Sequence, residues 1–282
     1  MNSVLVDESR GERYKAIGFL IVTAVLWSSG GLLIKWISWN PLAIAGTRSA
    51  IAALVLLVVL RRPHLTWSSA QIGGAIAYAV TVILFVLANK LTTAANAILL
   101  QYTSPIYIAL FGAWFLGERA TRLDWITIFV VIGGMVLFFL DDLTTGGFWG
   151  NVCAISSGVT FACLVLFMRK QKDGSPLESI FLGNILTALV GLPFMFEAMP
   201  SASSWVGLLL SGVLQLGLSH VLYAAAIKHI AALEAILIAV IEPILNPLWV
   251  LLIMGETPGP WALLGGFIVL VSVTIRYVAT AF

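Results

Sequence analysis

The segment Ala232–Glu256 reads ALEAILIAVIEPILNPLWVLLIMGE. It has the roughly 20 apolar residues that a membrane-spanning helix needs. Its centre, however, carries four residues that disfavour a plain spanning helix: Glu242, Pro243, Asn246 and Pro247. A carboxylate at mid-membrane costs about 2.5–3.5 kcal/mol on insertion scales, and Pro243 has no N–H for the carbonyl of Ala239. At membrane depth, a carbonyl without a helical donor is tolerated where the backbone is buried within the protein or lines a water-filled cavity. We therefore predict an interrupted helix at a functional site. A kinked structural helix with a neutral or paired Glu242 is the alternative.

The same pattern occurs twice in the chain, 138 residues apart. From Leu84 to Glu118, twelve of thirty-five positions are identical to the copy without a gap. The matched pairs include Lys90 with Lys228, Ala97–Leu99 with Ala235–Leu237, Pro105 with Pro243, and Gly117-Glu118 with Gly255-Glu256. Chance matches among apolar residues would not align a lone lysine, a proline and a Gly-Glu pair in one register. The chain is therefore predicted to be a tandem repeat.

Composition places the chain in a lipid bilayer. It is 60% hydrophobic and only 10% charged, against roughly 25% charged residues in an average soluble domain. The net charge of +2 is spread between the apolar segments, so we expect no nucleic-acid partner. Cys153 and Cys163 lie ten residues apart on one predicted helix, about 15 Å, which is too far for a disulfide between them.

We predict an all-α polytopic membrane protein with ten transmembrane helices, in two inverted five-helix repeats around a central cavity. The predicted helices span residues 15–37, 41–61, 68–89, 94–116, 122–140, 148–170, 176–196, 204–227, 232–253 and 258–280. The predicted domains are an N-terminal tail (1–14), a first repeat (15–140), a periplasmic linker (141–147) and a second repeat (148–282). Because each repeat has an odd number of helices, the second enters the membrane upside down.

The orientation follows from the distribution of lysine and arginine. Twelve of these residues fall on the side of the two termini, and only Lys35 and Lys90 fall on the other. Basic loops stay in the cytoplasm, so both termini are predicted to be cytoplasmic. We expect a multi-pass protein of the bacterial inner membrane, and a monomer is the simplest expectation for its oligomeric state.

Inverted repeats place substrate sites near the midplane, on interrupted helices at the repeat interface. One helix face of the first copy carries Gln101, Ser104 and Pro105, and the matching face of the second carries Glu242, Pro243 and Asn246. Pro105 and Pro243 are the predicted hinges. Hydrogen-bonded contact between helices is the alternative role for these polar groups.

A second pattern pairs aromatic with polar side chains on the third and eighth predicted helices. Tyr78, Thr81 and Phe85 form one stripe, and Thr81 and Phe85 correspond to Ser219 and Tyr223 in the second copy. Plain core packing is the alternative. Trp27 is too deep in its helix for the interfacial belt, which leaves a core role or a ligand contact. The predicted substrate-binding residues are Trp27, Ser28, Tyr78, Thr81, Phe85, Gln101, Ser104, Ser156, Thr160, His220, Tyr223, Glu242 and Asn246.

Other chemistry is not indicated. Arg48 lies within the second predicted helix, and we expect a structural role for it. No HExxH, GxSxG or Walker A motif occurs, and His64, His220 and His229 lack metal-site spacing. We therefore expect no metal, no cofactor and no enzyme activity. The alternative is an intramembrane enzyme that uses Glu242 and His220 as acid and base.

With these motifs in view, the chain resembles the drug/metabolite transporter superfamily, EamA type. The resemblance is carried by the in-span arginine in AGTRSAIAAL, by LTTAANAILLQYTSPIYIALFGAWFLGE and by its copy IAALEAILIAVIEPILNPLWVLLIMGE. Within that superfamily the chain looks most like bacterial exporters of aromatic amino acids. The resemblance implies export by alternating access, and a cavity walled by helices one, three, four, six, eight and nine.

The residues themselves suggest the substrate class. Aromatic walls with scattered polar groups suit a small solute with an apolar or aromatic body and a zwitterionic end. A phosphate substrate would need clustered lysine or arginine inside the bundle, and only Arg48 is within a span. We expect an exporter of aromatic and other neutral amino acids with a broad range that does not use ATP. Export of other small metabolites or drugs on the same fold is the alternative.

Overall fold

The computed structural model describes residues 2–138, 140, 147–197, 199–245, 249 and 260–281. All regular secondary structure in this part of the chain is helical, which confirms the predicted all-helical class. The α-helices are α1 (Asn2–Ser28), α2 (Gly30–Trp36), α3 (Pro41–Leu60), α4 (Ser69–Leu91), α5 (Ala94–Gln101), α6 (Ser104–Phe115), α7 (Arg122–Phe138), α8 (Phe148–Lys170), α9 (Pro176–Gly191), α10 (Ala202–Leu210), α11 (Ser219–Ala226), α12 (Ala232–Ala239) and α14 (Pro260–Ala281). A 3₁₀ helix, η1 (Leu192–Phe196), follows α9, and a π-helix, η2 (Ser211–Leu218), joins α10 to α11.

Within the described residues, seven helices are long and apolar enough to cross a membrane. They are Gly11–Trp36, Pro41–Leu60, Ser69–Leu91, Asn96–Phe115, Phe148–Lys170, Pro176–Phe196 and Ala202–Ala226, each within a few residues of a predicted span. The other three predicted spans coincide with α7 (17 residues), with α12 and the residues after it, and with α14. The count of ten therefore stays a prediction. Residues 141–146 of the predicted linker, and Asn246, Pro247 and Glu256, lie outside the described residues.

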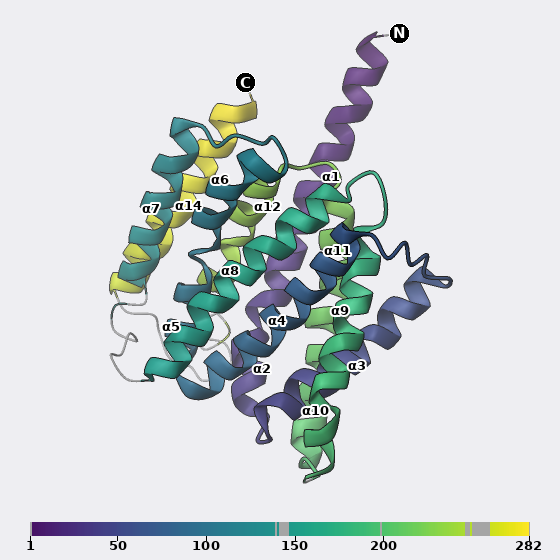
Figure 1. Cartoon of the computed structure of the whole chain (residues 1–282). Helices are drawn as coiled ribbons and strands as arrows, with labels where there is room; N and C mark the ends of the chain where they lie inside the picture. The colour runs from purple at the N-terminus through teal and green to yellow at the C-terminus, as the bar shows by residue number, and fades with distance from the viewer. Residues whose placement is uncertain are drawn as a thin grey trace.

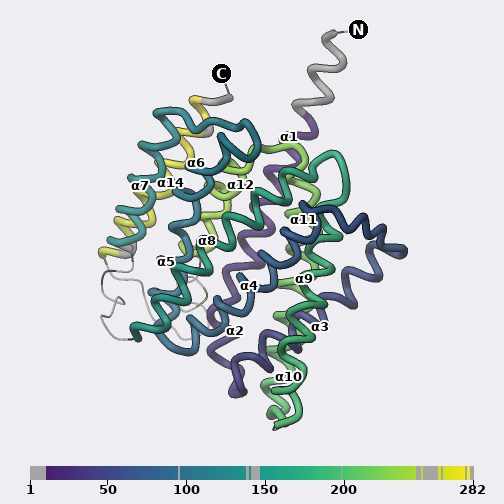
Figure 2. Tube along the Cα trace, in the orientation of Figure 1, coloured from purple at the N-terminus to yellow at the C-terminus, as the bar shows by residue number. Residues whose placement is uncertain are grey.

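The helices form one bundle in which segments distant in sequence lie side by side (Figures 1 and 2). α4 packs along α8, α1 along α11, and α3 along α9, while α7 and α14 form a pair at one edge. Small residues allow the closest of these approaches. A Cβ added to Gly46 would lie 2.8 Å from the Cα of Gly191, so α3 and α9 meet backbone to backbone.

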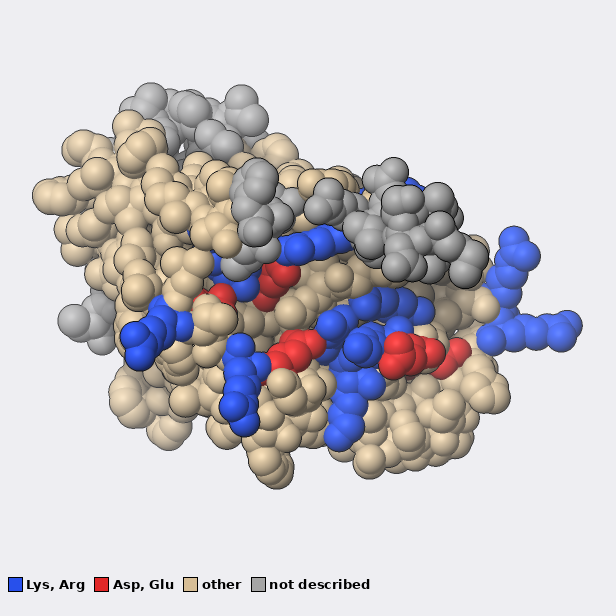
Figure 3. Space-filling model, turned by 90° about the horizontal axis from the view of Figure 1, so that it is seen from above, with Lys and Arg blue, Asp and Glu red and all other residues tan. Residues whose placement is uncertain are grey.

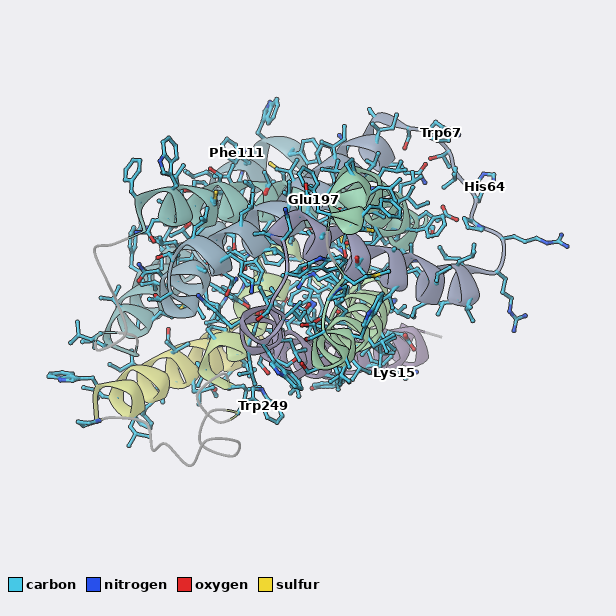
Figure 4. The ribbon with its side chains drawn as sticks, turned by 90° about the horizontal axis from the view of Figure 1, so that it is seen from below. Lys15, His64, Trp67, Phe111, Glu197 and Trp249 are labelled. Atoms are coloured by element: carbon cyan, nitrogen blue, oxygen red, sulfur yellow. The ribbon has the colours of Figure 1, made fainter. Side chains whose placement is uncertain are left out.

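Large apolar side chains cover the outside of the bundle. Trp114 is 84% exposed and Val58 is 77% exposed, which is unusual in a protein surrounded by water. Phe111 of α6 points outward from the edge of the bundle in the view from below (Figure 4). This surface is what a helix bundle in lipid presents, since the hydrocarbon is as apolar as the side chains.

Both termini lie at the same end of the bundle (Figure 1). Viewed from that end, lysine and arginine side chains gather on the surface, with acidic side chains among them (Figure 3). Three ion pairs join distant segments of the chain there: Arg13 with Glu234 at 2.8 Å, Arg169 with Glu118 at 2.7 Å, and Arg276 with Asp124 at 2.8 Å. We call this surface the basic face.

The first Gly-Glu pair has a clear structural role at the basic face. Gly117 has a φ of +73°, a left-handed conformation that favours glycine, and the chain turns there after α6. The turn brings Glu118 to the start of α12, where Oε2 accepts the N–H of Ala232 at 3.0 Å. Arg169 binds the other carboxylate oxygen and also donates to the carbonyl of Ile227, at 2.9 Å. The pair thus connects the end of α6 with α8, α11 and α12.

Candidate functional site

The two matched segments are interrupted at equivalent positions. In the first copy α5 ends at Gln101 and α6 begins at Ser104, with Tyr102 in the gap. In the second copy α12 ends at Ala239, Val240 is a turn residue, and helical backbone resumes over 241–245. Tyr102 and Val240 are 138 residues apart, the same shift that relates the two copies. Each interruption comes three residues before a proline, because the missing N–H weakens the helix there.

Tyr102 joins the two interruptions. Its hydroxyl donates to the carbonyl of Ala239 at 2.8 Å and lies 2.5 Å from Oε2 of Glu242. The Ala239 carbonyl is the one that loses its helical donor to Pro243. A buried carbonyl without a donor is costly, and a side chain from the other half of the chain supplies the donor. Sequence reasoning missed Tyr102, although a tyrosine three residues before the repeated Pro105 was a usable signal.

The three groups share a limited number of hydrogens. A tyrosine hydroxyl has one hydrogen, and a carbonyl can only accept. That hydrogen lies within reach of both the Ala239 carbonyl and Oε2 of Glu242, so the two acceptors share it. One hydroxyl of the first copy therefore contacts both the Ala239 carbonyl and the Glu242 carboxyl group of the second copy.

A cavity with a volume of about 60 Å³ adjoins these interruptions. At 10–15 Å³ for each water this is room for about four to six water molecules, so the cavity is narrow in this conformation. Both copies of the repeated pattern contribute to its wall. The lining residues are Trp27, Arg48, Tyr78, Thr81, Val82, Phe85, Gln101, Phe161, Leu164, Gln215, Leu216, His220 and Glu242.

Trp27 is the centre of an aromatic cluster on one wall. Its ring centroid lies 5.3 Å from those of His220 and Tyr223 and 5.8 Å from that of Phe161. Its indole N–H donates to Oγ of Ser219 at 2.9 Å, which fixes the orientation of the ring. Trp27 is 6% exposed and lines the cavity, so it is part of the core, and its contact with a ligand stays a prediction.

The polar residues of the wall are held by hydrogen bonds, two of them to another helix. Gln101 donates to Oγ of Ser157 at 2.8 Å, and Thr81 donates to Oγ1 of Thr160 at 2.9 Å. His220 donates from Nδ1 to the carbonyl of Leu216 in η2, at 2.7 Å. π-Helices are rare, and those that occur are often found at functional sites. The π-helix η2 contributes two residues to the cavity wall, Gln215 and Leu216.

The structure brings seven of the predicted residues together around the cavity. They are Trp27, Tyr78, Thr81, Phe85, Gln101, His220 and Glu242. Tyr223 and Thr160 lie directly behind the wall, in contact with Trp27 and Thr81.

The remaining predicted residues lie elsewhere. Ser28 donates to the carbonyl of Val25 at 2.6 Å and accepts from Trp249 at 2.7 Å. Ser104 is fully buried at the start of α6, and Ser156 is partly buried while its neighbour Ser157 faces the interior. Asn246 lies outside the described residues.

Arg48 and Gln215 line the cavity although sequence reasoning did not place them there. Arg48 is 1% exposed, and its Nε and Nη1 atoms have no hydrogen-bond partner among the described residues. The same holds for Oε1 of Gln215. A charged residue inside a span was the available signal for Arg48, but its helix is apolar on every side, so its sequence did not show which face meets the cavity.

Comparison with known proteins agrees with this architecture. The model of the EamA-like transporter family matches the chain twice, over residues 14–140 and 148–278. An uncharacterised transporter from Archaeoglobus fulgidus is 25% identical over 260 residues, 92% of this chain and 94% of that protein. The pseudopaline exporter CntI of Pseudomonas aeruginosa is 25% identical over 233 residues, 80% of this chain and 82% of that protein. A solved crystal structure at 18% identity has a TM-score of 0.79 over 95% of this chain and 98% of that chain, which shows a shared fold.

Proposed function

Because the chain belongs to the EamA-like transporter family, we propose that it exports aromatic and other neutral amino acids across the bacterial inner membrane. In this proposal the substrate site opens alternately to the two sides of the membrane, and ATP does not drive the alternation. The observation that carries the proposal is the composition of the cavity wall. Rings of the aromatic cluster line it together with Gln101 and Glu242, and each of these two polar residues comes from one of the interrupted segments. Rings bind the apolar body of a solute, and a few polar groups orient its charged end.

The proposed topology is ten helices in two inverted repeats with cytoplasmic termini. The two matches to one family model, over 14–140 and 148–278, support two related halves. The equivalent interruptions at Tyr102 and Val240 support the same register. The basic face supports a cytoplasmic location for both termini, because lysine and arginine accumulate on that side of membrane proteins.

Export of another small metabolite is the second candidate. The relative named as a pseudopaline exporter favours it, because that protein shares the fold family and carries a different solute. An intramembrane enzyme is less well supported. His220 and Glu242 both line the cavity, but His220 is bonded to Leu216 and Glu242 to Tyr102, so neither is held against the other.

Counterflow in proteoliposomes tests the proposal. Vesicles loaded with unlabelled amino acid should take up labelled phenylalanine, tryptophan, methionine and threonine without ATP, and should not take up hexose phosphates. Trp27→Ala should weaken the apparent affinity for phenylalanine about two- to tenfold, since a ring contact is removed. Trp205→Ala is the matched control, because Trp205 is 41% exposed on α10. Uptake of hexose phosphates or nucleotide sugars, with none of these amino acids, would refute the substrate class.

A further inference from the structure

Arg48 is buried in the bundle with hydrogen-bond donors that the described protein does not use. It is 1% exposed, and Nε and Nη1 have no partner among the described residues. A guanidinium has five N–H donors and stays charged, so burying it without acceptors is expensive. A structural arginine in a membrane protein would have these donors satisfied by carbonyls or by a carboxylate.

The cavity beside Arg48 contains one other charged residue. Glu242 lines the same cavity, and no ion pair joins the two among the described residues, although a buried ion pair does form between Arg276 and Asp124. Glu242 is instead engaged by Tyr102. The lining thus holds a cation and a carboxyl group that do not neutralise each other, with the aromatic cluster of Trp27 as part of the same wall.

We propose that Arg48 binds the carboxylate of the transported solute, and that this contact makes the protein selective for carboxylates. The inference rests on the proposed export function and adds the selective group. A planar guanidinium binds a carboxylate through two parallel hydrogen bonds, which is the strongest polar contact available to an amino acid. The apolar body then lies against the rings, and an ammonium group is left for Glu242. Solutes that lack the carboxylate leave Arg48 without an acceptor and are rejected.

Four related probes test the role of Arg48 in the full-length protein. They are L-phenylalanine, L-phenylalaninamide, 3-phenylpropanoate and phenethylamine, which share a ring and differ in the carboxylate and the ammonium. Binding is measured by thermal stabilisation of the purified protein, and transport by counterflow. We expect both carboxylates to bind about ten- to a hundredfold more tightly than the amide and the amine.

Two substitutions at Arg48 provide the matched comparison. Arg48→Gln should remove the preference for carboxylates and bring the four probes to similar affinity, while Arg48→Lys, which keeps the charge but not the planar fork, should retain part of it. Arg62→Gln is the control, since Arg62 is exposed just after α3 and outside the cavity. If Arg48→Gln does not fold, the probe series on the unmodified protein and on Arg48→Lys decides.

The outcomes separate the two proposals. Transport of the amide or the amine as well as the acids would overturn the role of Arg48 and leave the export function standing. Selective binding of the acids without any transport would overturn the export function and leave the role of Arg48 standing. An unchanged preference for carboxylates in Arg48→Gln, or no binding of either acid, would overturn the role of Arg48.

Discussion

At the scale of single residues, Tyr102 shows how a defect in one helix is repaired by another. Pro243 leaves the carbonyl of Ala239 without its helical donor, and the Tyr102 hydroxyl supplies one at 2.8 Å. The same hydroxyl contacts Glu242, so one side chain holds the interruption and the carboxyl group together. The loss of the hydrogen bond to Ala239 and a change at Glu242 should have separately measurable effects.

Tyr102→Phe should destabilise the protein by about 1–3 kcal/mol, because the Ala239 carbonyl is left buried without a donor while the ring still fills its space. Thermal unfolding of the purified protein measures this loss. Tyr107→Phe is the matched control, since Tyr107 is only partly buried on α6 and has no partner contact of this kind among the described residues. Equal stability of the two variants would contradict the role assigned to Tyr102.

Glu242→Gln should remove the pH dependence of transport and leave the protein folded. Glutamine keeps the shape of the side chain and can still form a hydrogen bond with Tyr102, but it does not gain or lose a proton over the pH range of a transport assay. Counterflow of phenylalanine over a range of pH, with unmodified protein beside the variant, gives the comparison. A pH profile that is unchanged in the variant would limit Glu242 to a structural or ligand-contacting role.

At the scale of elements, the important feature is a helix that stops and restarts in the membrane. α5 and α6 are separated at Tyr102, and α12 is separated from the following helical residues at Val240. Each gap removes regular backbone hydrogen bonds and is a place where the two parts of a segment can change their angle. The prolines three residues later keep the gaps from closing into regular helix.

Pro243→Ala restores an N–H that can bond to the carbonyl of Ala239 in competition with Tyr102. We expect the second copy to become a more continuous helix, and transport to slow by about tenfold or more while stability rises or stays equal. Pro105→Ala should act in the same direction on the first copy. Counterflow rates and unfolding temperatures of both variants test the hinge role, and wild-type rates in both would refute it.

At the scale of the whole molecule, charged side chains gather on the end of the apolar bundle that carries the termini. The termini and three ion pairs between distant segments lie at the basic face, and the sides of the bundle carry exposed residues such as Trp114. A membrane protein is oriented by such an asymmetry, since basic loops remain in the cytoplasm.

A reporter fused after Phe282 tests this orientation. A fluorescent protein that folds only in the cytoplasm should give signal there, and an enzyme active only in the periplasm should be silent. The same pair of reporters inserted in the loop after Trp36 should give the opposite result, which controls for expression. Reversal of both readings would invert the proposed topology.

The sequence by itself determined the membrane class, the positions of the seven helices long enough to span and the interruptions beside Pro105 and Pro243. These properties depend on composition and on local backbone chemistry, which neighbouring residues reveal. The tertiary structure alone decided which side chains share the cavity. A membrane helix is apolar on every side, so periodicity did not distinguish the inner face that carries Arg48 from the lipid face. Tyr102 and Ala239 are 137 residues apart, and only packing brings that hydroxyl to that carbonyl.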